Sequence, residues 1–167
     1  MGQQLSEREF ESLVCTNEGE RVLAVALRAL VRRPYSRQEM EQKLSQKQFS
    51  AEMVMRALDN LTERGLLNDV EFARFWCENR DAFRPRSRAL VGLELKRKGV
   101  APEDIRAATA DMDDEASALQ VGAKKAKMLG KADCNTFYRR LGDYLRRRGY
   151  NYEVIQATVK KLWQTRV

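Results

Sequence analysis

The chain of 167 residues contains no histidine, so it lacks the side chain that most often serves as a general acid, a general base or a metal ligand. It has only three cysteines, Cys15, Cys77 and Cys134, which lie far apart and form no CxxC pair. An odd number of widely spaced cysteines argues against a disulfide framework or a zinc site and is typical of a reduced, cytoplasmic protein. We therefore expect a cytoplasmic protein without a metal or other cofactor.

Other signatures are also missing. No apolar run approaches the roughly 18–20 residues that span a bilayer, and the opening residues MGQQLSEREFESL are acidic, without the hydrophobic stretch of a signal peptide. There is no glycine-rich phosphate loop, no activated serine or cysteine and no evident pair of catalytic carboxylates. These absences predict a protein that is neither an enzyme nor membrane-bound.

The positive charge is concentrated at one end of the chain. The formal net charge is +7, yet residues 1–68 carry ten basic and ten acidic side chains, and residues 69–114 carry nine and ten. Residues 115–167 carry twelve basic and four acidic side chains. A basic surface confined to the last third indicates an acidic partner such as nucleic acid, although a solvated face that only aids solubility has the same composition.

Three stretches of the sequence align without gaps, at offsets of 51 and then 50 residues: LSQKQFSAEMVMRALDNL (44–61), LKRKGVAPEDIRAATADM (95–112) and LRRRGYNYEVIQATVKKL (145–162). Apolar residues recur in register, and each copy is typical of a helix, a turn and a second helix. Gly99 and Gly149 occupy the turn position, where glycine favours the left-handed conformation, whereas the first copy has Gln48 there.

Capping residues indicate where the helices begin. Ser36 and Glu39 have the spacing of a capping box, as do Asn68 and Glu71, and Ser50 and Asn151 precede the second helices of their copies. In the second copy Pro102 stands in the first helical turn, where a missing backbone donor costs nothing. A further helix is predicted before each pair, over residues 21–31, 69–80 and 115–130, with Phe72, Phe75 and Trp76 facing inward in the second.

The sequence therefore predicts an all-α protein of three tandem three-helix, helix–turn–helix-like repeats. The expected boundaries are an N-terminal extension over 1–20, then repeats over 21–68, 69–114 and a basic 115–167.

Three segments of the sequence resemble those of the RecX family, regulatory proteins of the RecA recombinase: RPYSRQEMEQKL (33–44), LTERGLLNDVEFARFW (61–76) and LVGLELKRKGV (90–100). The similarity covers roughly residues 21–163. Asn68 stands where the family often has aspartate, and Phe83–Arg84–Pro85 replaces a loop that more usually contains glycine. The resemblance implies an elongated, curved molecule that binds in the groove of the RecA–DNA filament and restrains its extension, ATP hydrolysis and strand exchange.

The candidate contact residues for the filament are mostly basic, because planar guanidinium groups match phosphate oxygens in pairs. One predicted helix carries all five arginines of the third repeat, from Arg139 to Arg148. Tyr150, in the register of Phe49 and Val100, is expected to belong to the core, and Tyr152 is the better candidate for an exposed aromatic side chain. Contacts are expected with RecA and with the phosphates of single- and double-stranded DNA, by a monomer. The candidates are Arg146, Arg147, Arg148, Arg139, Arg140, Lys124, Lys125, Lys127, Lys96, Arg97, Lys98 and Tyr152.

Four other interpretations concern these and neighbouring residues. The basic surface is equally typical of a nucleic-acid-binding protein that acts without RecA. A sequence-specific repressor would read bases with the start of its second helix, but residues 51–60 and 101–112 are neutral or acidic and 152–161 are basic only at the far end. The acidic run Asp111, Asp113 and Asp114 lacks the glycine of a calcium loop and is typical of a solvated linker. Arg84, Arg86 and Arg88 form a loop that binds a partner or is merely solvated.

Overall fold

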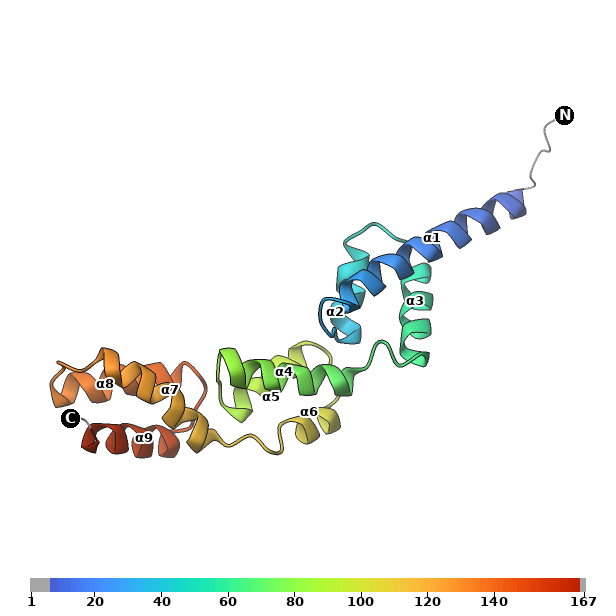
Figure 1. The fold of residues 1–167 in the computed structure, drawn as a ribbon. Coiled ribbons are helices and arrows are strands. Elements are labelled where there is room, and N and C mark those ends of the chain that lie inside the picture. Colours follow the sequence, from blue (N-terminus) through green and yellow to red (C-terminus); the bar gives the residue numbers. More distant parts are fainter. Residues whose placement is uncertain (1–6, 166–167) are drawn as a thin grey trace. The chain divides into compact units, whose positions relative to one another are not determined.

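The computed structural model describes the backbone of residues 7–165 and the side chains of residues 17–165. Within this range the chain forms helices and no strand, which confirms the all-α prediction (Figure 1). The helices are α1 (Glu7–Leu30), α2 (Arg37–Ser45), α3 (Ala51–Glu63), α4 (Asp69–Phe83), α5 (Arg88–Arg97), α6 (Pro102–Ala108), α7 (Asp114–Met128), α8 (Cys134–Arg146) and α9 (Tyr152–Gln164).

The helices form two compact units. The first contains the described residues up to Phe72 together with Lys98–Val100, and the second contains Ala73–Arg97 and the described residues from Ala101 onward. In the first unit, α1, α2 and α3 enclose a core that includes Val22, Met40, Leu44, Leu58 and Leu61.

In the second unit, α7, α8 and α9 pack around Phe137, Leu141 and Leu145. Trp163 of α9 lies against Phe137, with ring centroids 5.2 Å apart. Gly122 brings α7 close to α9, because a Cβ at this position would come within 2.9 Å of Leu162.

The predicted capping residues begin their helices. Ser36 accepts the backbone N–H of Glu39, Ser50 that of Met53 and Asn151 that of Val154. Asn68 accepts from Val70 and Glu71. Each such bond satisfies a backbone donor that the helix itself leaves open, and is worth about 1 kcal/mol. The reciprocal half of the first capping box differs from the prediction, since the Glu39 carboxylate pairs with Arg33 and Lys98.

The predicted turns have the expected backbone. Gly99 and Gly149 have φ angles of 81° and 86°, and Gln48 adopts the same conformation with φ 60° although it carries a side chain. Gly65, which follows α3, is also left-handed, with φ 68°. A non-glycine residue in this region is strained by about 1–2 kcal/mol. The first copy of the repeat therefore closes by the less favourable turn, as its sequence indicates.

The first helix begins earlier than predicted, and the inward-facing aromatic residues of the fourth are buried to different degrees. The helix predicted over residues 21–31 begins at Glu7 and includes Gly19, so it runs through the described part of the segment assigned to an N-terminal extension. In α4, Phe72 is fully buried but Phe75 and Trp76 are only half-buried. The Trp76 indole N–H reaches a polar partner, Glu94, at 2.8 Å, which explains why its ring lies at the edge of the core.

Candidate functional site

The outward face of α8 carries four arginines. Arg139 and Arg146 are seven residues apart, as are Arg140 and Arg147, so the helix places them in two pairs, with Arg147 as the residue that caps its end. All four are exposed, while Phe137, Leu141 and Leu145 hold the opposite face in the core. Arg146 pairs with Asp143 at 3.1 Å, and the other three form no ion pair with any described residue. This exposed arginine face of α8 is the densest group of candidate residues.

Arg148 does not belong to that face, which corrects the prediction that one helix carries all five arginines. Helix α8 ends at Arg146, and Arg148 lies in the turn beyond it. Its guanidinium stacks on the ring of Tyr144, 3.9 Å from the centroid, and its backbone carbonyl accepts the N–H of Ser87 at 2.9 Å. Such stacking holds the cation against the protein, so Arg148 stabilises the turn.

Some lysines of α7 are exposed, and one lies against the protein. Lys124 and Lys127 are exposed, whereas Lys125 is half-buried with its ammonium 5.9 Å from the centroid of the Tyr144 ring. Tyr144 is thus flanked by Lys125 and Arg148, two cations from different parts of the chain. The exposed lysines extend the basic surface of the second unit.

In the second repeat, Lys96 and Arg97 are exposed at the end of α5, and Lys98 is not. Lys98 forms an ion pair with Glu39 and lies 6.0 Å from the ring of Phe72. Burial alone would raise the pKa of Glu39, but the hydrogen bonds and positive charges of Arg33 and Lys98 outweigh it and lower that pKa below its usual range. Lys98 is therefore engaged in the fold.

The two tyrosines behave as predicted. Tyr152 is 75% exposed, whereas Tyr150 is 4% exposed and its hydroxyl lies 2.7 Å from the Ser117 hydroxyl. Burial raises the pKa of Tyr150. Tyr150 is a core residue, and Tyr152 presents an exposed aromatic ring at the start of α9.

Glu94 was not anticipated from the sequence. Its carboxylate accepts from Trp76 and from Arg80, at 2.8 and 2.7 Å, and pairs with Arg86. Burial opposes ionisation of Glu94, yet the Arg80 and Trp76 hydrogen bonds and the Arg80 and Arg86 charges lower its pKa overall. Arg86 is thus tied to α5, while Arg84 and Arg88 remain exposed. Glu94 and its partners meet only in the folded protein, and no local spacing in the sequence predicts these contacts.

Two of the three linker aspartates have structural roles. Asp113 caps α7 by accepting from Glu115 and Ala116, and Asp114 accepts the backbone N–H of Arg88 at 2.7 Å. No group of three or more histidine, cysteine, aspartate or glutamate side chains suited to a metal ion occurs among the residues whose side chains are described. In the same part of the chain, no helix is both long and apolar enough to cross a membrane.

Comparison with known proteins identifies the family. Family models of RecX match the chain at residues 23–61 (first three-helix domain), 68–108 (second) and 113–159 (third). The Regulatory protein RecX of Chlorobium limicola is 33% identical over 143 residues, which cover 85% of this chain and 89% of that protein. The Regulatory protein RecX of Amycolatopsis mediterranei is 33% identical over 132 residues, covering 77% and 75%.

Solved structures agree at the level of the fold. The crystal structure of RecX from Lactobacillus salivarius superposes with a TM-score of 0.73 at 17% identity, covering 89% of this chain and 99% of that one. A second crystal structure of regulatory protein RecX gives a TM-score of 0.74 at 19% identity, covering 94% and 79%. Three matched domains in order, together with relatives at one-third identity over most of their length, establish that the chain belongs to the RecX family of regulatory proteins.

Proposed function

We propose that this protein regulates RecA, mainly as an inhibitor, by binding in the groove of the RecA–DNA filament and limiting filament extension, ATP hydrolysis and strand exchange. Membership of a family of regulatory proteins supports a role without catalysis. On this proposal the protein acts as a monomer, without a cofactor, and contacts both RecA and DNA phosphates.

The observation that carries the proposal is the exposed arginine face of α8. Arg139, Arg140 and Arg147 project from one helix without an ion-pair partner among the described residues, and Lys124 and Lys127 lie exposed on the neighbouring α7. Asp143 is the one carboxylate among these arginines on α8, so the face is positive overall, which favours an anionic partner. Guanidinium groups bind phosphate oxygens through paired donors, which suits them to the DNA within a filament.

Inhibition follows from bridging. A ligand that contacts a helical polymer at several points binds far more tightly than any one contact allows, because the first contact raises the effective concentration of the next. Lys96 and Arg97 of α5 and Tyr152 of α9 provide further exposed contact points. A ligand fixed at several points across successive subunits would resist the movements that accompany ATP hydrolysis and strand exchange.

The alternative is sequence-nonspecific binding to nucleic acid without RecA, and the net charge of the last third favours it. Base readout by a helix–turn–helix is not supported, because the first turns of α3, α6 and α9 carry the acidic residues Glu52, Glu103 and Glu153. Binding through phosphates alone would be steeply salt-dependent, with a slope set by the number of phosphates neutralised.

One titration separates the two functions. The protein is added to RecA on single-stranded DNA and the ATPase rate is followed, while its affinity for the same DNA without RecA is measured at several salt concentrations. The proposal predicts a dose-dependent fall in ATPase activity at protein concentrations that leave bare DNA largely unbound. An unchanged rate at saturating protein would contradict it, and inhibition only where bare DNA is already covered would favour the alternative.

A further inference from the structure

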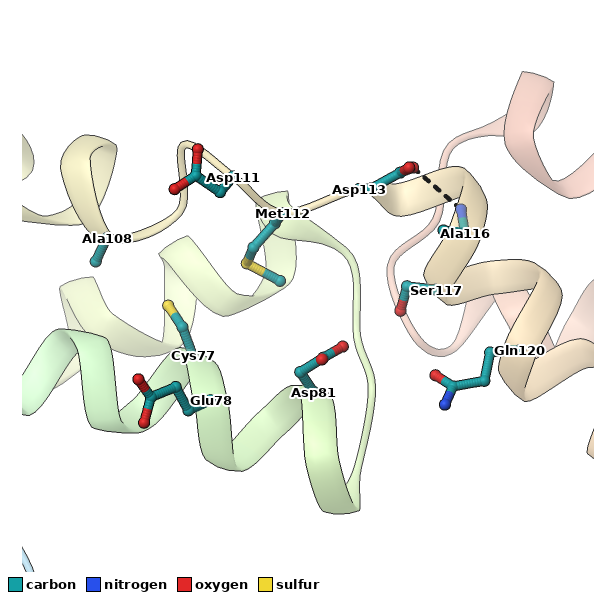
Figure 2. A pocket seen from close by; sticks show the side chains of 10 residues that line it. All are labelled: Cys77, Glu78, Asp81, Ala108, Asp111, Met112, Asp113, Ala116, Ser117 and Gln120. Atoms are coloured by element: carbon teal, nitrogen blue, oxygen red, sulfur yellow. Dashed lines mark hydrogen bonds between the residues drawn. The ribbon is translucent and has the colours of Figure 1, made fainter.

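The second unit contains a groove with a volume of about 540 Å³ that none of the basic candidate residues lines. It lies between α4, the segment that follows α6, and the first half of α7 (Figure 2). Its lining residues are Cys77, Glu78, Asp81, Ala108, Asp111, Met112, Asp113, Ala116, Ser117 and Gln120.

The floor of the groove is apolar. The Met112 side chain and the Cys77 thiol point toward each other across it, and Ala108 and Ala116 add methyl groups (Figure 2). Cys77 is 8% exposed, and burial, together with the charge of Glu78, raises its pKa to about 11. The thiol is therefore neutral near pH 7 and acts as a small apolar group. Such a floor accepts methylene or methyl groups of a ligand.

The rim of the groove is acidic. Glu78 and Asp81 are one turn apart on α4, and both side chains are exposed. Figure 2 shows the Asp81 carboxylate in the gap between α4 and α7, facing Ser117 and Gln120. Asp111 adds a third exposed carboxylate, while Asp113 is occupied in capping α7. No lysine or arginine is among the described residues that line the groove.

This combination restricts the occupant. DNA is repelled by the carboxylates, so the groove is not an extension of the basic surface. A long basic side chain fits, because lysine and arginine place an aliphatic stem on apolar surface while the charged head reaches a polar rim.

We propose that this groove binds a lysine or arginine side chain, with an apolar neighbour, presented by a loop or helix of the protein partner. The inference rests on the proposed function, in which that partner is RecA. On this proposal the second unit has two contact surfaces. The acidic groove contacts protein, and the exposed arginine face of α8 contacts DNA phosphates.

Helix α7 takes part in both surfaces. Asp114 and Glu115 lie in its first turn, Ser117 and Gln120 line the groove, and Lys124 and Lys127 follow toward its C-terminus. At a rise of about 1.5 Å per residue, Ser117 and Lys127 are separated by about 15 Å along the helix axis. One rigid element therefore holds the two surfaces at a fixed spacing.

The test uses the sign of the charge change. The double variant Glu78→Gln and Asp81→Asn raises the net charge by two, which strengthens attraction to DNA and weakens attraction to a cation. We expect its affinity for RecA without DNA to fall on the order of ten-fold. Inhibition of the filament ATPase should need correspondingly more protein, while binding to bare DNA is unchanged or tighter. The matched control, Glu41→Gln with Glu63→Gln, changes two exposed carboxylates of the first unit by the same charge and should behave like the unaltered protein.

A second variant tests the cavity without changing charge. Ala116 is exposed at the start of α7, so Ala116→Leu is expected to fold and to fill part of the groove. It should weaken RecA binding in the same direction. If both variants retain the helical circular dichroism spectrum and inhibit RecA as well as the control does, the groove is not the protein contact. If the unaltered protein itself fails to inhibit RecA, the proposed function fails with it, and the two failures are thereby told apart.

Discussion

The turn that ends α5 and the turn that ends α8 are the same structure built with different chemistry. Each contains the end of a run of three basic residues, 96–98 or 146–148, and each closes on a glycine with positive φ. A Cβ on Gly99 would meet Gln38 of α2, and a Cβ on Gly149 would meet Ser87 and Leu90 at the start of α5. In each run the first two residues are exposed and the third is engaged, Lys98 by the Glu39 carboxylate and Arg148 by the Tyr144 ring.

The residues of one basic run in this repeat protein do not all have the same role. The residue just before the turn glycine is drawn against the protein in both copies, whatever its partner. The first two residues are exposed in both copies, although Arg146 also pairs with Asp143 on its own helix. Three arginines that look equivalent in the sequence therefore divide into two contact candidates and one structural residue.

The largest expected effect concerns the two glycines. Gly149→Ala should destabilise the fold by about 2–4 kcal/mol, because it adds left-handed strain and a Cβ within 2.7 Å of the helix-bound Leu90 Cβ. Gly99→Ala should cost somewhat less, since the closest atom there is the mobile end of Gln38 and the Gln38 Cβ lies at 2.9 Å, farther than the Leu90 Cβ from position 149. Gly65→Ala, which has a φ of 68° and no neighbour within 4 Å, isolates the strain alone at about 1 kcal/mol. Urea denaturation gives this order, and equal costs at all three would show that close packing is unimportant.

The second prediction uses the charge on Glu39. Its lowered pKa means that the folded state holds the carboxylate ionised more readily than the unfolded chain does, so the pair stabilises the fold above the usual glutamate pKa. That stability is lost as the pH falls through the lowered pKa. Glu39→Gln should cost about 1–2 kcal/mol at pH 7 and progressively less below pH 4. Thermal unfolding of both proteins from pH 7 to pH 3 measures this, and a pH-independent gap would contradict it.

A smaller effect separates Arg148 from its neighbour. Arg148→Ala removes the stacking on Tyr144 and should destabilise the fold by about 1 kcal/mol. Arg147→Ala, which removes an exposed side chain, should change stability by less than about 0.5 kcal/mol. The same urea titration compares them. Equal destabilisation would mean that the two arginines do not differ in role.

The smallest effect is a gain in stability. Gln48 occupies the turn position that Gly99 and Gly149 hold in the other copies, with φ 60°. Gln48→Gly should relieve the strain and stabilise the protein by about 0.5–1 kcal/mol, since glycine adopts this conformation freely but loses more entropy on folding. A lower melting temperature for Gln48→Gly would show that the glutamine side chain makes a compensating contact.

Local signals in the sequence predicted most helix starts and the turns at Gly99 and Gly149, because a cap or a left-handed residue acts within four positions of itself. These local signals did not predict features that depend on contacts between residues far apart in the sequence. The first helix was predicted to begin at residue 21, yet α1 begins at Glu7 and continues through Gly19, whose weak helix preference does not end it. The exposure of Arg139, Arg140, Arg146 and Arg147 followed from helical spacing, whereas the partners of Lys98 and Arg148 did not.

The acidic groove was equally hidden from the sequence. Glu78 and Asp81 come from one helix and Met112 from a linker, so no motif unites them, and Cys77 is notable only as an isolated cysteine. Their convergence is a product of packing within the second unit. A site of this kind can be found only in a structure, because its residues are close together in space but follow no regular spacing in the sequence.

The central claim is that the exposed arginine face of α8 carries the regulatory contact, and charge reversal tests it most directly. Arg140→Glu with Arg147→Glu alters two exposed side chains without an ion-pair partner among the described residues. The control Arg28→Glu with Lys47→Glu makes the same change in net charge on exposed positions of the first unit. The half-inhibitory concentration in the single-strand-stimulated RecA ATPase assay should rise at least ten-fold for the α8 variant and little for the control, with helical content unchanged in both. Equal inhibition by the two variants would contradict the account.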